Sequence, residues 1–209
     1  MRLKSGSLFF FVLVLSACSK PLFQSSWIKE TGPANFTARF ESTRGNFDIE
    51  VIREWSPLGA DRFYQLVKHR LFDNTIIYRA VPGYVVQFGN TDSVKIIQWE
   101  KNPIPDEPVI EGNLKMNVGF ARSGKNSRKS QIFINLNNNQ RLDTLQYNNS
   151  RGFPAFGRIV AGAAIVEKIY TGYGNESMKK WDLLYSNRKG FLDSFPLLDQ
   201  ISKAYLLKK

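Results

Sequence analysis

Two apolar runs with a few embedded polar side chains constrain the fold of this chain more than any other feature. The first run covers residues 78–89 and carries Arg79 and Gln87, and the second covers residues 120–134 and carries Gln131. Short apolar runs of this kind predict buried strands. A polar side chain in a buried strand needs a hydrogen-bonding partner, which a ligand in a groove can supply. We therefore expect a sheet with an apolar face, and Arg79, Gln87 and Gln131 at the border of a groove on that face.

Other segments also predict short strands. Apolar and polar residues alternate over residues 36–40 and 47–51, on both sides of a turn that contains Gly45, which predicts a hairpin with one buried face. Ser56-Pro57 offers a helix cap followed by proline, so we expect a helix from there to about residue 71. Further strands are expected over residues 76–81, 84–88, 116–121, 130–136 and 156–160, with a second short helix over residues 162–170.

The stretch over residues 90–113 contains three prolines, so we expect neither a helix nor a central strand in it. Asp106-Glu107, within this stretch, is expected to form a solvated turn. The apolar content of 43% suits one globular domain with its own core. Many short strands with two helices favour a closed barrel or a sandwich.

The N-terminus has the organisation of a secretory signal. A basic start is followed by an apolar run over residues 8–15 and by Leu15-Ser16-Ala17-Cys18, and the run is too short to span a membrane. These last four residues also resemble a bacterial lipobox, in which the chain is cut before the cysteine and the cysteine is acylated. The alternative is an ordinary signal peptide with a chance cysteine at the cut.

The lipobox interpretation divides the chain into a signal peptide (residues 1–17), a lipidated tether (18–34) and a folded domain (35–209). It predicts a lipoprotein of the bacterial cell envelope that is labelled by palmitate and held to a membrane through Cys18. Ser19 favours the outer membrane over the inner membrane, because it is not the Asp that retains many enteric lipoproteins at the inner membrane. Cys18 is the only cysteine in the sequence, so it can form no internal disulfide.

The charge balance is strongly basic. Loss of Arg2 and Lys4 with the signal leaves 27 basic against 18 acidic side chains, a formal charge of +9. Such a balance favours anionic surfaces such as lipid headgroups, polyanions and nucleic acid. We expect most basic side chains to be solvated, and no specific nucleic-acid partner. A surface adhesin that binds polyanions is a weaker alternative function, and it would use Arg122, Lys125, Arg128 and Lys129.

The order of motifs in the two apolar runs resembles the cyclophilin family of peptidyl-prolyl isomerases. The family has an Arg followed closely by Pro-Gly-aromatic and then Gln, and a later strand with Ser-Gln-x-Phe. Here these motifs are Arg79, Pro82-Gly83-Tyr84, Gln87 and Ser130-Gln131-Ile132-Phe133. The resemblance covers residues 36–173, and residues 195–206 are similar to the C-terminal part of a bacterial envelope branch. It implies a mainly β fold, a closed eight-stranded antiparallel β-barrel capped by two α-helices.

The resemblance also implies a monomeric peptidyl-prolyl cis-trans isomerase that needs no cofactor or metal and helps exported, proline-containing polypeptides to fold. Arg79 would donate to the imide nitrogen of the twisted amide, Gln87 would hold Arg79 and contact the substrate, and Phe133 would complete the catalytic set. The substrate-binding residues would be Tyr84, Val85, Ala121, Arg122, Gln131, Leu142 and Phe153, with Arg122 contributing mainly its main chain. The alternative is a chaperone or scaffold module that binds proline segments with little or no turnover.

Several positions depart from the common family pattern. Tyr78 replaces the His that usually precedes the Arg, Tyr84 replaces the Phe of the pocket floor, and Val85 stands where Met is frequent. The hydroxyl of Tyr84 must find a partner beside an apolar pocket, so we expect reduced turnover. Phe88 replaces a Gly, and Arg141 stands where a Trp is frequent, which argues against cyclosporin binding.

Two further motifs do not predict a site. Residues 119–126 nearly spell a phosphate-binding loop, but Asn126 replaces the Ser or Thr that would contact magnesium, and a strand follows instead of a helix. His69 is the single histidine of the sequence and has no Cys or carboxylate at ligand spacing. We expect His69 to be a surface residue, and no metal site.

Overall fold

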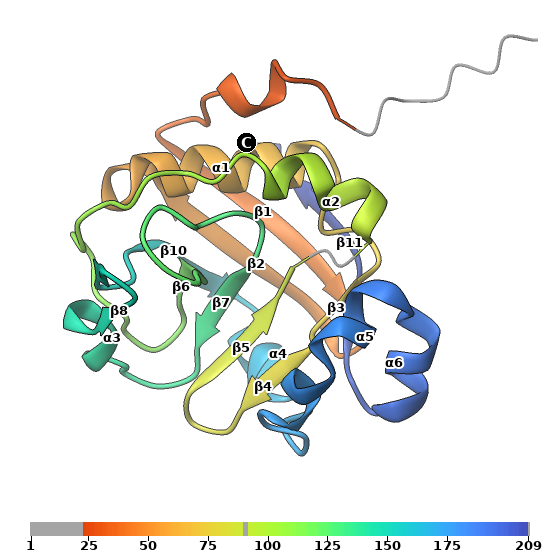
Figure 1. Cartoon of the computed structure of the whole chain (residues 1–209). Helices are drawn as coiled ribbons and strands as arrows, with labels where there is room; N and C mark the ends of the chain where they lie inside the picture. The colour runs from red at the N-terminus through yellow and green to blue at the C-terminus, as the bar shows by residue number, and fades with distance from the viewer. Residues whose placement is uncertain (1–22, 90–91, 209) are drawn as a thin grey trace, which may run out of the picture.

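A curled antiparallel sheet forms the body of the protein (Figure 1). The computed structural model describes residues 23–89 and 92–208. In this part of the chain, nine strands are hydrogen-bonded in the order β3-β11-β1-β2-β10-β6-β7-β5-β4. Their bounds are β1 Asn35–Ser42, β2 Gly45–Ile52, β3 Thr75–Ile76, β4 Arg79–Val81, β5 Val85–Phe88, β6 Asn117–Phe120, β7 Ile132–Asn135, β10 Ala155–Ala161 and β11 Gln200–Leu206. The short strands β8 (Gln146–Tyr147) and β9 (Ser150–Arg151) form a separate pair.

The expected hairpin is confirmed as β1 and β2, in which Phe40 pairs with Phe47 and their rings stack at 5.2 Å between centroids. The strand expected over residues 76–81 is divided into β3 and β4. The division follows from different pairing partners: β3 pairs with β11, a pairing that the bond from the N–H of Ile77 to the carbonyl of Asp199 extends (2.9 Å), whereas β4 pairs with β5.

The sheet is not a closed eight-stranded barrel. It has nine strands in the described part of the chain, and its two edges, β3 and β4, are not paired with each other. Only two residues separate these edge strands along the chain, so the edges lie at a seam. The C-terminal segment, residues 175–195, packs on this seam. Its side chains Leu184, Phe191 and Phe195 contact Ile76 and Tyr78. The seam is therefore covered by side-chain packing, which takes the place of a closing ladder of hydrogen bonds.

The two helices expected from the sequence are confirmed as α1 (Pro57–Lys68) and α4 (Ala163–Glu167). Helix α1 lies across one end of the curled sheet (Figure 1) and buries Phe63, Leu66 and Val67 in the core. The remaining helical elements were not predicted: α2 Ser93–Glu100, α3 Arg141–Thr144, α5 Trp181–Ser186, α6 Arg188–Ser194 and the 3₁₀ turns η1 Trp27–Lys29, η2 Arg53–Trp55 and η3 Glu176–Lys180. In the described residues, no helix is both long enough and apolar enough to cross a membrane.

Helix α2 corrects the expectation that residues 90–113 contain no helix. The helix ends before the first proline of the stretch, and the side chain of Asp92 caps its first turn by accepting hydrogen bonds from the backbone of Val94 and Lys95. Ile96 and Trp99 turn inward and are buried. The three prolines therefore exclude a helix only from the second half of the stretch.

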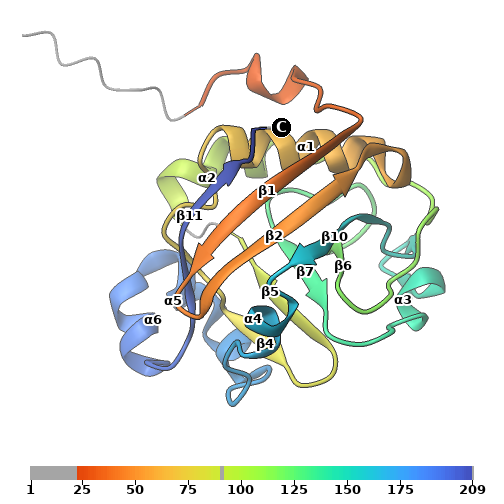
Figure 2. The same cartoon turned by 180° about the vertical axis from the view of Figure 1, so that it is seen from behind.

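The segment before β1 packs on the domain. The sequence predicts a tether over residues 18–34, whereas its described part, residues 23–34, runs along the face that carries α1 (Figures 1 and 2). Trp27 stacks on His69 with ring centroids 3.8 Å apart, and Glu30 contacts Nε2 of His69 at 2.8 Å. The side chain of His69 is only 12% exposed. The expectation of a surface histidine is therefore wrong. The signal sequence and Cys18 lie outside the described residues.

Candidate active site

The motif residues Arg79 and Gln87 face each other across two neighbouring strands. The turn at Pro82-Gly83 joins β4 to β5, and it needs a glycine because Gly83 has φ of 63°. This hairpin pairs Arg79 with Gln87, and Nη1 of Arg79 donates to Oε1 of Gln87 at 2.8 Å. On its other side, Nε of Arg79 donates to Oδ1 of Asn175 at 2.7 Å. Two acceptors from different segments therefore fix the guanidinium.

An apolar pocket opens beside this guanidinium. Val85, Phe133 and Leu142 are buried together, and Tyr84, Ala121, Leu145 and Phe153 pack around them. The pocket has a volume of about 330 Å³, and both Arg79 and Gln87 belong to its lining. The structure thus brings together nine of the ten site residues predicted from the sequence: Arg79, Gln87, Phe133, Tyr84, Val85, Ala121, Arg122, Leu142 and Phe153.

The position of Phe133 depends on a glycine in the neighbouring strand. Gly119 in β6 pairs with Phe133 in β7, and a Cβ atom at Gly119 would lie 2.9 Å from Cζ of the Phe133 ring. Phe153 meets the same ring edge to face, with centroids 6.1 Å apart. Tyr84 lies at the entrance, where its ring centroid is 5.7 Å from Cζ of Arg79.

Gln131, the tenth predicted residue, lines a second cavity of about 470 Å³ that shares Gln87, Ala121 and Arg122 with the first. Its amide is held between two tyrosines. The hydroxyl of Tyr78 donates to Oε1 of Gln131 at 2.9 Å, and Nε2 of Gln131 donates to the hydroxyl oxygen of Tyr185 at 2.6 Å. Burial raises the pKa of both tyrosines, so both hydroxyls stay protonated at neutral pH.

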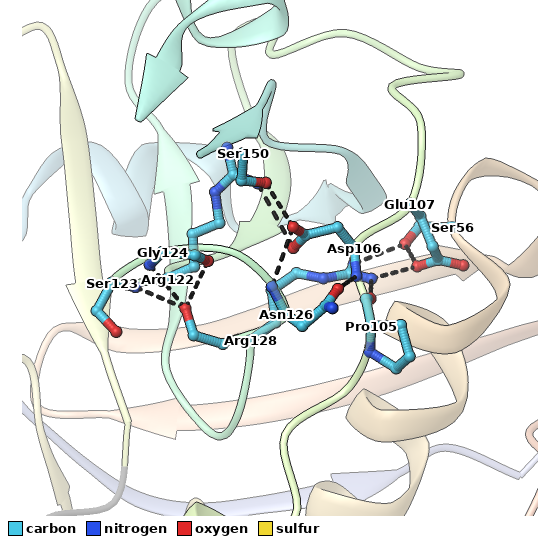
Figure 3. Close-up of polar contacts among 11 residues, drawn as sticks. Ser56, Pro105, Asp106, Glu107, Arg122, Ser123, Gly124, Asn126, Arg128 and Ser150 are labelled. Atoms are coloured by element: carbon cyan, nitrogen blue, oxygen red, sulfur yellow. Dashed lines mark hydrogen bonds and ion pairs between the residues drawn. The ribbon is translucent and has the colours of Figure 1, made fainter. Parts of the chain in front are cut away.

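The basic stretch near the pocket is not a solvated patch. The side chains of Arg122 and Arg128 are each 1% exposed, and they pair with Asp106 and Glu107 (Figure 3). This corrects two expectations, that the two arginines are solvated and that Asp106-Glu107 is a solvated turn. It also removes two of the four side chains on which a polyanion-binding surface would depend.

Glu107 also caps helix α1. Its carboxylate accepts hydrogen bonds from the backbone N–H groups of Leu58 (2.7 Å) and Gly59 (3.1 Å) and from the hydroxyl of Ser56. The sequence predicts Ser56 as the cap, but the acceptor comes from a loop about fifty residues away. Carboxylates are favourable at this position because the first N–H groups of a helix have no partner within the helix.

Sequence comparisons identify the family. A family model described as "Cyclophilin type peptidyl-prolyl cis-trans isomerase/CLD" matches residues 37–184. This chain belongs to the cyclophilin family. It is 28% identical over 138 residues to a peptidyl-prolyl cis-trans isomerase of Acinetobacter baylyi, covering 65% of this chain and 72% of that protein. It is 31% identical over 131 residues to peptidyl-prolyl cis-trans isomerase A of Dickeya dadantii, covering 61% of this chain and 67% of that protein.

The protein is therefore a cyclophilin-type isomerase that acts on proline-containing peptides. The described residues contain no group of three or more His, Cys, Asp or Glu side chains that could hold a metal ion. The site is an apolar pocket whose lining includes the guanidinium of Arg79, fixed by Gln87 and Asn175.

Some lining residues of this cyclophilin were missed by sequence reasoning. Leu145, Tyr147 and Met178 complete the pocket, Asn175 holds Arg79, and Tyr185 holds Gln131. Leu145 follows Leu142 by three residues, a spacing that could have predicted a shared helical face. Asn175, Met178 and Tyr185 carry no local signal, because their positions depend on how the C-terminal segment packs over the seam. Tyr147 lies in the two-residue strand β8, which is too short to show a period.

Proposed function

We propose that the pocket beside Arg79 binds the proline ring of the substrate and that Arg79 catalyses the isomerisation. Rotation about an X-Pro bond must overcome a barrier of about 18 to 20 kcal/mol, because it breaks the amide resonance. In the twisted amide the imide nitrogen regains a lone pair. A cationic donor aimed at this nitrogen stabilises the transition state more than the planar ground state, which raises the rate.

The observation that carries this proposal is the fixed guanidinium at the mouth of an apolar pocket. Gln87 and Asn175 hold Arg79 at 2.8 and 2.7 Å, so little reorganisation is needed when the substrate arrives. Phe133, Val85 and Leu142 supply the apolar walls on which a proline ring can pack. Gln87 would also contact the substrate, and Gln131 and the main chain at Ala121 and Arg122 would bind the residues that precede the proline.

A protease-coupled assay on a panel of short X-Pro peptides tests the catalytic role of Arg79. We expect the protein to accelerate isomerisation and Arg79→Ala to lose most of this activity. Arg158→Ala is a matched control, because Arg158 is an exposed strand arginine that pairs with Glu50 outside the pocket. An Arg79→Ala protein as active as the control would contradict the role of Arg79. Peptide binding without any acceleration would instead favour a binding module.

We also propose that the enzyme is an envelope lipoprotein anchored through Cys18, with the outer membrane favoured by Ser19, and that it helps exported proteins to fold. The lipobox-like residues 15–18 support this. Phe23 is docked on the domain, where its ring contacts Trp99 with centroids 5.4 Å apart. Five residues span at most about 18 Å, so a lipid on Cys18 would hold the domain close to the bilayer.

Palmitate labelling in a bacterium with a lipoprotein pathway tests the anchor. We expect the wild-type protein to incorporate palmitate and to partition into detergent, and Cys18→Ser to do neither. Equal labelling of the Cys18→Ser protein would contradict the anchor and would leave an ordinary signal peptide. This result would not affect the proposed role of Arg79.

A further inference from the structure

Two buried arginines clamp the loop around residues 105–107 to the loop over residues 122–128 (Figure 3). Arg128 contacts Glu107 at 2.9 Å and Ser56 at 3.2 Å, and both partners belong to the cap of helix α1. The clamp made by Arg122 differs, because Arg122 also lines the proline pocket. The guanidinium of Arg122 therefore has an acidic group on one side and the pocket on the other.

Ser150 and Asp106 fix the guanidinium of Arg122. Nη1 of Arg122 donates to the hydroxyl of Ser150, which in turn donates to Oδ2 of Asp106 at 2.5 Å. The same carboxylate lies 3.6 Å from Nη1 of Arg122 through its other oxygen and accepts from the backbone N–H of Asn126 at 3.0 Å. Asp106 is therefore held from three directions, and it keeps the side chain of Arg122 in one place.

The same guanidinium of Arg122 lies over the ring of Phe153. Cζ of Arg122 lies 4.3 Å from the centroid of the Phe153 ring, within the range of a cation–π contact. Nε and Nη2 of Arg122 are buried and have no hydrogen-bond partner among the described residues. Buried N–H groups without acceptors are costly, and the face of an aromatic ring is a surface that can offset part of this cost for a guanidinium. The contact to Phe153 is therefore a main interaction of this side chain.

Phe153 lies between Arg122 and Phe133. Its ring packs edge to face on Phe133, which is a wall of the pocket, and it is only partly buried. An aromatic ring at the rim of a pocket can leave through a rotation about χ1, and the affinity for a ligand falls by the fraction of time that it is away. A cation fixed against the ring keeps it in the position that completes the pocket.

We propose that Arg122 is a positioning residue for substrate binding, which acts by holding Phe153 at the rim of the proline pocket through a guanidinium fixed by Asp106 and Ser150. This inference rests on the proposed function of the pocket. It assigns to the side chain of Arg122 a role beyond the main-chain contacts that the resemblance implies. Because the rim contacts the substrate equally in the ground state and the transition state, Arg122 contributes to affinity and KM and little to kcat.

The test compares Arg122→Met with Arg122→Lys. Methionine keeps the apolar stem but removes the charge, so the dissociation constant for an X-Pro peptide and KM are expected to rise roughly three- to thirtyfold, with kcat within about twofold of wild type. Lysine keeps the charge without the planar fork and is expected to restore part of the affinity. In a Phe153→Leu background, Arg122→Met is expected to have no further effect on affinity, because the ring through which it acts is gone.

Arg128→Met is the matched control. Arg128 is equally buried and belongs to the same pair of loops, but its side chain contacts Ser56, Pro105 and Glu107, none of which lines the pocket. We expect this variant to melt at a lower temperature and to bind the peptide like the wild type, and Arg128→Lys replaces it if the methionine variant does not fold.

Two outcomes would overturn the inference. One is a folded Arg122→Met protein with the affinity of the wild type, and the other is an equal loss of affinity from Arg122→Met with and without Phe153. If the wild-type protein itself does not bind proline peptides, the assignment of the pocket fails first. The wild-type measurement therefore separates a failure of the proposed function from a failure of this inference.

Discussion

At the scale of single residues, the pocket depends on polar groups that are fixed from both sides. Arg79 lies between Gln87 and Asn175, and Gln131 lies between Tyr78 and Tyr185. The sequence motif supplies only one partner of each pair, Gln87 for Arg79 and the neighbouring Tyr78 for Gln131. The second partners, Asn175 and Tyr185, come from residues 175–186. The motif residues could therefore be predicted from the sequence, but these second hydrogen-bonding partners could not.

The stability of the protein at low pH tests whether the folded state holds Asp106 as a carboxylate. Burial tends to raise the pKa of this carboxyl, but hydrogen bonds from Ser150 and Asn126 and the charge of Arg122 outweigh burial and leave the pKa below its usual value. A lowered pKa in the folded state adds stability at pH values above the unfolded pKa of about 3.9, and this stability is lost as the pH falls through the folded pKa. We expect Asp106→Asn to flatten this acid limb in urea unfolding followed from pH 6 to pH 2.

The control for this experiment is Asp193→Asn, since Asp193 is exposed and pairs with Lys189 on the surface of α6. The acid limb of this control should match that of the wild type. An Asp106→Asn protein with an unchanged acid limb would mean that the carboxylate is not held more firmly in the folded state than in the unfolded state.

At the scale of elements, the strands that carry the motifs were predictable and the helices that cover them were not. The β1–β2 hairpin, α1, β5 and β7 each have a clear period or an apolar run of the right length. Residues 175–194 are rich in charged residues and contain short helical elements of five to seven residues, for which periodicity is a poor guide. Their fold is decided by packing on the seam between β3 and β4, a feature of tertiary structure.

Removal of a side chain at this seam tests its role. Phe191 in α6 is fully buried among Ile76, Tyr78 and Leu184, so Phe191→Ala is expected to lower the free energy of unfolding by about 3 to 5 kcal/mol in urea titrations. Leu197→Ala is the control, because Leu197 is 53% exposed and its loss should change stability by about 0.5 kcal/mol or less. Equal stability of the two variants would mean that the helical segment does not cover the seam.

At the scale of the whole molecule, the family and the mainly β class could be predicted, and the closure of the sheet could not. In the described residues, nine strands curl around a core of phenylalanines and aliphatic residues, and side chains from the C-terminal segment cover the seam. The buried ion pairs also mean that the formal net charge overstates the number of basic side chains at the surface. Arg122 and Arg128 contribute to the sequence total of +11, but their side chains are almost entirely buried.

The central claim is that Arg79 stabilises the twisted amide, and the exchange rate of an X-Pro peptide bound to the enzyme tests it most directly. NMR line shapes at several enzyme-to-peptide ratios give this rate and the dissociation constant together. Loss of a donor used in the transition state costs roughly 2 to 4 kcal/mol, so Arg79→Ala is expected to slow the bound-state exchange by about 30- to 1000-fold. The dissociation constant should rise much less than this. Bound-state exchange at the wild-type rate in Arg79→Ala, or a loss of affinity as large as the loss of rate, would contradict the account.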